Sequence, residues 1–215
     1  NRMLSNKKRL LWIALWGVLI IGIAFQLRTA GLFRGLEDDV VFHPDEAKQV
    51  DALYNYLHGR YVWYVGNLFY DGYPLFLDHV DEWLLRPFFR LRSFMASCSG
   101  LDPLGAPSRT DLFYWSRACR VLYGMLALLL AWPAARLLGL PRSAAFLCAG
   151  MLALAPLSSV VTHSATGDAG VDLFTAFIIL CAGWLARRPA SWAASFCAGL
   201  FIAFAFAAKY QGLLA

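Results

Sequence analysis

The chain has 215 residues, of which 60% are apolar and only 15% are charged. Because a soluble domain carries about 25% charged residues, this composition excludes a soluble surface over the whole chain, and it also excludes disorder, collagen, a coiled coil and a disulfide-stapled secreted domain. Lipid must cover part of the chain, which is therefore expected to be an integral membrane protein.

The net charge of +5 is unevenly distributed. Residues 28–115 hold twelve of the 14 acidic and eight of the 19 basic residues, a net charge of −4, and the remainder carries +9. The basic excess lies in short clusters beside apolar runs, which is typical of cytoplasmic membrane anchors and unlike a stripe that follows a phosphate backbone. No nucleic-acid partner is expected.

Five apolar segments are candidate membrane spans, because about 20 apolar residues cross about 30 Å of hydrocarbon. The first lies between Arg9 and Arg28 and lacks a small-residue cleavage site, so it is expected to remain as a span rather than to act as a signal peptide. We predict an all-α polytopic membrane protein that forms a single transmembrane domain over 1–215. Its spans are expected at about 10–27, 116–138, 143–161, 166–186 and 189–208.

Basic residues predict the orientation of these spans. Clusters at 7–9, 136–142 and 187–188 fall on one face if every span crosses fully, and the positive-inside rule makes that face cytoplasmic. The long loop 28–115 and Lys209 then lie on the outer, periplasmic face. High Ala content, and Arg outnumbering Lys, favour a bacterial inner (cytoplasmic) membrane, with the N-terminus in the cytoplasm.

The outer loop 28–115 is expected to contain two helices that lie along the membrane surface. Glu82–Ala96 mixes aromatic residues with arginines, as an interfacial helix does. Between the two helices, Tyr61–Leu77 is rich in aromatic residues and contains turn signals. The other helix is expected over Pro44–His58, where apolar residues recur at helical spacing. These are Ala47, Val50, Leu53, Tyr54 and Leu57.

The most distinctive local motif is Phe42-His43-Pro44-Asp45-Glu46. Pro44 suits the first position of a helix, which puts Asp45 and Glu46 in the first turn, where the helix dipole favours carboxylates. They are then either simple N-terminal helix charges or a carboxylate site at the membrane surface that acts as a general base or metal ligand.

A second group of polar residues lies at the predicted outer end of the fourth span. Asp168 and Asp172 are four residues apart and share one helical face. Ionisable groups in a span are costly and are functional candidates, although Asp168 at the outer end can equally be a helix cap. His163 is either a ligand or an interfacial polar residue. Because these residues lack a diagnostic metal spacing, no metal site is predicted.

Lys209 ends the last apolar run on the outer side. It is either a snorkelling anchor or a cation that binds a lipid phosphate. The cysteines lie mostly in spans and form no CxxC pair, so they are expected to serve packing.

Three segments together resemble the GT-C membrane glycosyltransferases, in the branch of the protein O-mannosyltransferases and the lipid A aminoarabinose transferases. The segments are FHPDE, the run from Ser116 to Asp168 (SRACRVLYGMLALLLAWPAARLLG…THSATGD), and AGLFIAFAFAAKYQGLLA. They cover most of the chain. The family's usual Thr before the lysine is Ala208 here, and the chain is far shorter than the family's members, which implies an N-terminal portion or a reduced member.

The resemblance implies transfer of a hexosyl or pentosyl group from a polyprenyl-phosphate sugar at the outer face of the membrane. Asp45 would be the general base, supported by Glu46, and Lys209 would stabilise the departing phosphate. Membrane lipid and the lipid-linked sugar are the expected partners; further membrane subunits and a divalent cation stay open. The substrate-binding residues that it implies are Lys209, Arg60, Asp168, His163 and Tyr210.

Two other classes of function are alternatives to the enzyme. A non-catalytic membrane subunit would keep the scaffold in order to bind lipid or a partner, and the short chain favours it, whereas FHPDE and Lys209 favour the enzyme. A small transporter would need polar residues near mid-span or broken repeated helices, and it ranks last.

Overall fold

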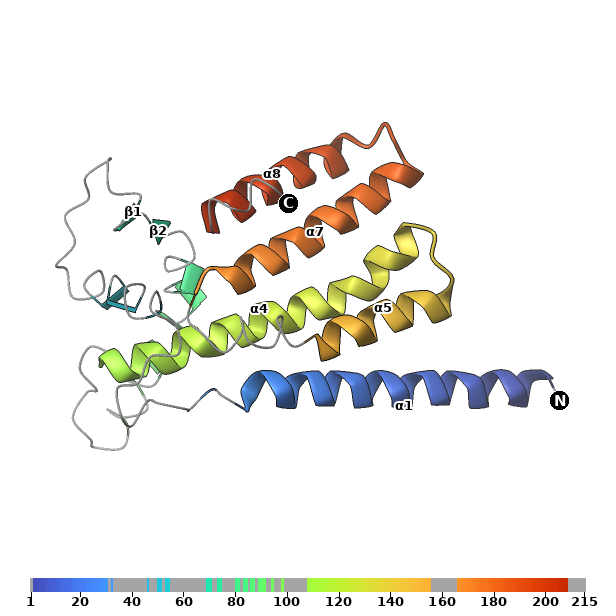
Figure 1. Cartoon of the computed structure of the whole chain (residues 1–215), viewed down its shortest axis with the longest axis horizontal. Helices are drawn as coiled ribbons and strands as arrows, with labels where there is room; N and C mark the ends of the chain where they lie inside the picture. The colour runs from blue at the N-terminus through green and yellow to red at the C-terminus, as the bar shows by residue number, and fades with distance from the viewer. Residues whose placement is uncertain are drawn as a thin grey trace.

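The computed structural model is a bundle of antiparallel helices with a two-stranded hairpin at one end (Figure 1). The helices are α1 (Arg2–Thr29), α4 (Arg109–Leu137), α5 (Arg142–Leu154), α7 (Asp168–Arg187) and α8 (Trp192–Ala208). The strands β1 (Phe69–Tyr70) and β2 (Tyr73–Pro74) pair antiparallel, with Tyr70 opposite Tyr73. The structure describes residues 2–30, 32, 46, 50–51, 53–54, 69–70, 73–74, 80–81, 83–84, 86–87, 89–91, 94, 98, 108–155 and 166–208.

Successive helices run in opposite directions (Figure 1). One end of the bundle, here called the loop end, holds the C-terminal residues of α1, α5 and α8, the N-terminal residues of α4 and α7, and the β-hairpin. The opposite end, here called the basic end, holds the N-terminus and the arginines around 136–142 and 187–188. The prediction that the basic clusters share one side of the bundle therefore agrees with the path of the chain.

The helices show that this is a helical membrane protein. Among the described residues, three helical segments are long and apolar enough to cross a membrane: Leu11–Thr29, Arg109–Leu137 and Asp168–Arg187. The apolar helices α5 and α8 are shorter, with 13 and 17 residues. At 1.5 Å per residue, α5 extends about 20 Å, which is less than the roughly 30 Å of a hydrocarbon core.

The observed end of α5 differs from the predicted span 143–161. The helix ends at Leu154, and Ala155 adopts an extended conformation with φ −62° and ψ 117°. Residue 156 is a proline, and the clash of a proline ring with the preceding residue disfavours helical geometry there. The X-Pro signal was visible in the sequence and marks the end of this helix better than apolar content does.

The start of α4 also differs from the prediction. The helix begins at Arg109 rather than at Ser116, because Ser108 and Asp111 form a capping box. The Asp111 N–H donates to Ser108 Oγ at 3.1 Å, and the Ser108 N–H donates to Asp111 Oδ2 at 3.1 Å. The added turns extend α4 into the segment that was predicted as outer loop, where they form a platform for that loop.

The centre of the bundle is α4, which packs against α7, α5 and α1, while α8 packs on the far side of α7. In the most apolar stretch of α4, 50% of the residues are buried, whereas in that of α1 only 11% are buried. The described side chains of α1, from Leu11 onward, are therefore mostly exposed, as expected for a helix with lipid on most sides.

At the basic end, α4 and α7 approach closely. A Cβ added at Gly183 of α7 would lie 2.8 Å from Leu137 Cβ, so only glycine fits at this contact. Beside it, the Arg187 guanidinium donates to the carbonyl oxygens of Arg136 and Leu137 at the end of α4. These contacts satisfy carbonyl groups that have no partner within α4.

Candidate functional site

Two buried ion pairs lie on successive turns of α4 at the loop end. Arg117 pairs with Glu46, and Arg120 pairs with Asp81; all four side chains are fully buried. Arg117 and Arg120 are three residues apart and hence neighbours on one side of the helix. Each arginine thus binds a carboxylate from a different part of the segment that was predicted as outer loop.

The Arg117–Glu46 pair is bidentate. Arg117 Nε donates to Glu46 Oε1 at 2.6 Å and Nη2 donates to Oε2 at 3.0 Å, the planar geometry that a guanidinium and a carboxylate favour. Arg117 Nη1 also donates to the Leu32 carbonyl oxygen at 3.4 Å, just beyond α1. Arg117 therefore joins the acidic motif, the exit of α1 and the N-terminal half of α4.

The residues that follow Glu46 dock along the platform of α4. Glu46, Val50, Asp51, Leu53 and Tyr54 are helical, and Val50 and Leu53 are buried with Leu112 and Phe113 of α4. These described residues agree with the predicted helix, and two positions of its predicted apolar stripe, Val50 and Leu53, are buried.

A third ion pair, which is exposed, lies at the far end of this contact. Arg109 binds Asp51 through Nε to Oδ1 at 2.6 Å and Nη2 to Oδ2 at 3.1 Å, with both side chains more than 40% exposed. Glu46 lies beside Arg117 and Asp51 beside Arg109, so the segment runs antiparallel to α4.

The Asp81 carboxylate accepts hydrogen bonds from three residues of α4. Arg120 Nη1 lies 2.8 Å from Oδ2, Tyr123 Oη donates to Oδ1 at 2.7 Å, and Ser116 Oγ donates to Oδ2 at 3.5 Å. Burial raises the pKa of Asp81, and the attraction of Arg120 and these hydrogen bonds oppose the rise. A buried carboxylate with this many donors holds its own segment firmly against α4.

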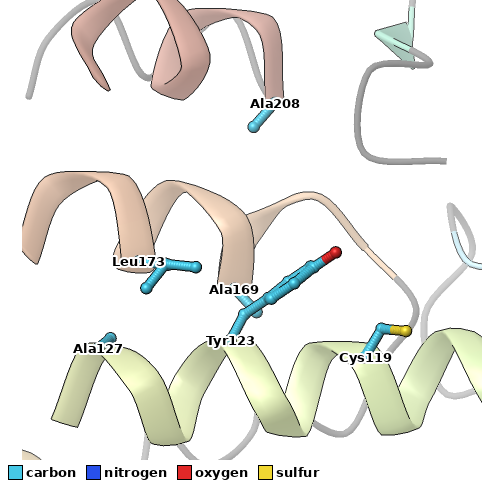
Figure 2. Packing of buried hydrophobic residues seen from close by; sticks show 6 residues of the cluster. All are labelled: Cys119, Tyr123, Ala127, Ala169, Leu173 and Ala208. Atoms are coloured by element: carbon cyan, nitrogen blue, oxygen red, sulfur yellow. The ribbon is translucent and has the colours of Figure 1, made fainter. Parts of the chain in front are cut away.

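Tyr123, which donates to Asp81, also belongs to a small apolar cluster in which three helices meet (Figure 2). Tyr123 extends from α4 toward the first turn of α7, with Ala208, the last residue of α8, on the far side of α7. The loop end is thus closed by side chains from α4, α7 and α8 together. The buried members of this apolar cluster are Cys119, Tyr123, Ala127, Ala169, Leu173 and Ala208.

The start of α7 carries two carboxylates, Asp168 in the first turn and Asp172 one turn further along. Thr166 Oγ1 donates to Asp168 Oδ2 at 3.0 Å, and Asp168 is partly exposed. Asp172 interacts electrostatically with Asp168 and, across the bundle, with Arg28. Gly167 is the N-cap residue of α7 and no side chain caps the helix, so Asp168 is a first-turn carboxylate with exposed surface rather than the cap.

Arg28 has a structural role. Its side chain is fully buried, and Nη1 donates to the Ala153 carbonyl oxygen at 3.1 Å and to Ala24 O at 3.3 Å. Nη2 donates to Leu152 O at 3.4 Å. The end of α1 is thereby fastened to the last turn of α5, whose carbonyl groups favour a cation.

The structure describes two of the predicted site residues. Glu46 is buried against Arg117, and Asp168 lies in the first turn of α7. No structural statement covers the other five, which lie outside the described residues: Asp45, Arg60, His163, Lys209 and Tyr210. Of the aromatic loop Tyr61–Leu77, only the short hairpin is described.

Sequence reasoning missed the roles of Arg117, Arg120 and Asp81. Both arginines lie near the start of the predicted span 116–138, and arginines within an apolar helix are costly and signal buried partners. That rule, applied to the run from Ser116 onward, would have predicted carboxylate partners. Asp81 itself has no distinguishing local pattern.

Among the residues that the structure describes, no group of three or more His, Cys, Asp or Glu side chains is arranged to hold a metal ion. In comparisons with known proteins, no family model, no curated protein and no solved structure matches this chain. The geometry of the loop end therefore carries the functional argument.

Proposed function

We propose that the chain is a polyprenyl-phosphate-sugar-dependent glycosyltransferase, or the N-terminal portion of one, that acts at the outer face of the membrane with Asp45 as general base. One observation supports this. Glu46, the neighbour of Asp45, pairs with Arg117 of α4, and Ala208, the neighbour of Lys209, belongs to the buried cluster that α4, α7 and α8 form at the same end of the bundle.

The two contact points on α4, Arg117 and Tyr123, lie close together along the helix. Glu46 binds Arg117, and Ala208 belongs to the cluster of Tyr123. Six residues along a helix correspond to about 9 Å. The neighbour of Asp45 thus pairs with α4, and the neighbour of Lys209 shares a cluster with α4, at positions of that helix that lie within two turns of each other.

The proposed orientation has five crossings, with the N-terminus in the cytoplasm and the loop end in the periplasm of a bacterial inner membrane. The common location of the basic clusters at the opposite end supports it. In this arrangement the shorter helices α5 and α8 also count as crossings.

In the proposed reaction, Asp45 takes the proton of an acceptor hydroxyl, whose oxygen attacks the anomeric carbon of the donor. The bond from that carbon to the phosphate oxygen breaks, and polyprenyl phosphate leaves with the bonding electrons. Lys209 and Arg60 stabilise the negative charge that develops on the phosphate. Asp168, His163 and Tyr210 contact the sugar or the acceptor.

The Arg117–Glu46 pair gives Glu46 a specific part in this proposal. Both of its carboxylate oxygens accept hydrogen bonds from Arg117, so it is better suited to hold the start of its helix than to exchange protons. It is therefore a positioning residue for Asp45, in agreement with the supporting role that the resemblance implies.

The same pair also favours the alternative, a non-catalytic membrane subunit. The one described carboxylate of the acidic motif is engaged in a structural contact that would serve a scaffold equally well. The two functions differ in whether lipid-linked sugar is turned over, so a single assay separates them.

The assay uses the full chain reconstituted in lipid vesicles with one polyprenyl-phosphate hexose and one polyprenyl-phosphate pentose as donors. Asp45→Asn is expected to lower turnover by about 100-fold or more, as for loss of a general base. Asp51→Asn removes a carboxylate from the exposed pair with Arg109 and is the matched control, expected to remain within about twofold. Undiminished turnover in Asp45→Asn excludes Asp45 as the base, and wild-type chain that binds both donors without turnover supports the subunit.

A further inference from the structure

The segment 80–98 is anchored on one side and exposed on the other. Every described residue in it is helical, and its inner side buries Asp81 against Arg120 and packs Phe89 edge-on against Trp115, with ring centroids 6.2 Å apart. The opposite side lines an open groove of about 590 Å³. This side, here called the arginine–aromatic face, consists of Trp83, Arg86, Pro87, Arg90, Leu91 and Phe94.

The spacing of these residues places them on a single helical face, because they follow one another at intervals of three or four, or as direct neighbours. Trp83 is 79% exposed and Phe94 is 66% exposed, although both are large and apolar. Arg86 and Arg90 lie between them and are also exposed. A face with bulky apolar groups at its ends and cations at its centre is too apolar for water alone.

The surroundings indicate what covers this face. The inner side of the segment is fixed to α4, one of the three helices long enough to cross a membrane, so the segment lies beside the bilayer in which that helix sits. Tryptophan and phenylalanine favour the boundary between headgroups and acyl chains, and arginine favours lipid phosphates. Both preferences are met by one surface, a leaflet that contains anionic lipid.

We propose that the arginine–aromatic face is a docking surface for anionic phospholipid headgroups. Arg86 and Arg90 bind the lipid phosphates, and Trp83, Leu91 and Phe94 enter the boundary with the acyl chains. The Asp81–Arg120 pair transmits this attachment to α4 and so fixes the height of the loop end relative to the membrane surface. The proposal concerns lipid contact alone and does not depend on donor turnover.

The test is amide hydrogen exchange of the full chain in nanodiscs of phosphatidylcholine alone and of phosphatidylcholine with phosphatidylglycerol. Exchange within 80–98 is expected to be about tenfold slower in the anionic discs, since each arginine near an anionic surface contributes a several-fold preference. Added salt should reduce this difference by screening.

Variants assign the effect to the face. Arg86→Gln with Arg90→Gln should exchange equally in both lipids, whereas Arg86→Lys with Arg90→Lys should keep most of the difference and so shows that the fold tolerates change there. Arg142→Gln with Arg188→Gln, at the basic end, is the matched control and should leave exchange in 80–98 unchanged. Equal exchange of the wild-type chain in the two lipids overturns the proposal and leaves a protein partner as the occupant. A lipid difference that persists in the glutamine variant also overturns it.

Discussion

The two ends of the bundle both depend on arginine, but in different ways. At the basic end, Arg187 donates to the last carbonyl oxygens of α4, and Arg136 donates to the carbonyl oxygen of Leu140 in the turn that follows its own helix. At the loop end, Arg117 and Arg120 bind carboxylates that are distant in the sequence. The basic end is thus closed by local contacts to backbone, and the loop end by contacts that select particular partners.

This difference indicates where change is tolerated. A helix terminus accepts many cations, and water can replace them at an exposed position. A buried carboxylate accepts only a partner with matching charge and geometry, and removing that partner leaves a desolvated charge. Substitutions at the loop end should therefore have larger effects than those at the basic end.

The largest effect is expected for Arg117→Ala. It removes the compensating charge from the buried Glu46 and should lower the free energy of unfolding by about 3–5 kcal/mol. Arg117→Met combined with Glu46→Leu removes both charges and should recover most of that loss. Chemical unfolding in detergent micelles measures both variants. If the double variant is as unstable as Arg117→Ala, charge compensation is not the reason for the loss.

Tyr123→Phe is a milder test of the buried Arg120–Asp81 pair. It removes one hydrogen bond to the Asp81 carboxylate while the ring stays in its cluster, and should cost about 1.5–3 kcal/mol. The matched control is Tyr114→Phe, on the same helix but partly exposed and outside this cluster. Equal losses in the two variants, again by chemical unfolding, would mean that the Asp81 contact contributes nothing specific.

Gly183→Ala tests close packing at the basic end. The added methyl group would lie 2.8 Å from Leu137 Cβ and 3.3 Å from its backbone, so α4 and α7 must move apart at a cost of about 1–3 kcal/mol. Gly199→Ala in α8 meets nothing within 4 Å and should be neutral or slightly stabilising. Thermal unfolding midpoints of the two variants measure the contrast, and a lower midpoint for Gly199→Ala would contradict it.

The smallest effect is expected for Asp51→Asn. Its pair with Arg109 is short but exposed, and exposed pairs contribute only about 0.2–1 kcal/mol. The effect should also shrink as salt is added, unlike that of Arg117→Ala. Unfolding measured at low and high ionic strength checks both statements, and a loss as large as that of Arg117→Ala would remove the distinction between buried and exposed pairs.

Much of the helical framework could be predicted from local pattern. The expected segments 166–186 and 189–208 correspond closely to α7 and α8, because long apolar runs on either side of the Arg187–Arg188 pair mark helices clearly. The prediction was less accurate where short signals compete with apolar content, at the capping box of α4 and at the proline that follows Ala155. The number of complete crossings stays a prediction.

The candidate site was less accessible to sequence reasoning. The motif around Glu46 was selected, and Val50 and Leu53 were expected on an apolar stripe, but nothing local connects them to Arg117. Ion pairs between positions 71 and 39 residues apart depend on how two segments fold back on one helix. The catalytic roles of Asp45 and Lys209 stay predictions that the proposed assay tests.

By itself, the sequence determined that this is a helical membrane protein and where most of its helices lie, because apolar length, charge clusters and caps act over a few neighbouring residues. Only the tertiary structure decided which carboxylate binds which arginine. That choice depends on burial: once Arg117 and Arg120 leave water, each needs an opposite charge at hydrogen-bond distance, and only the folded chain brings Glu46 and Asp81 there.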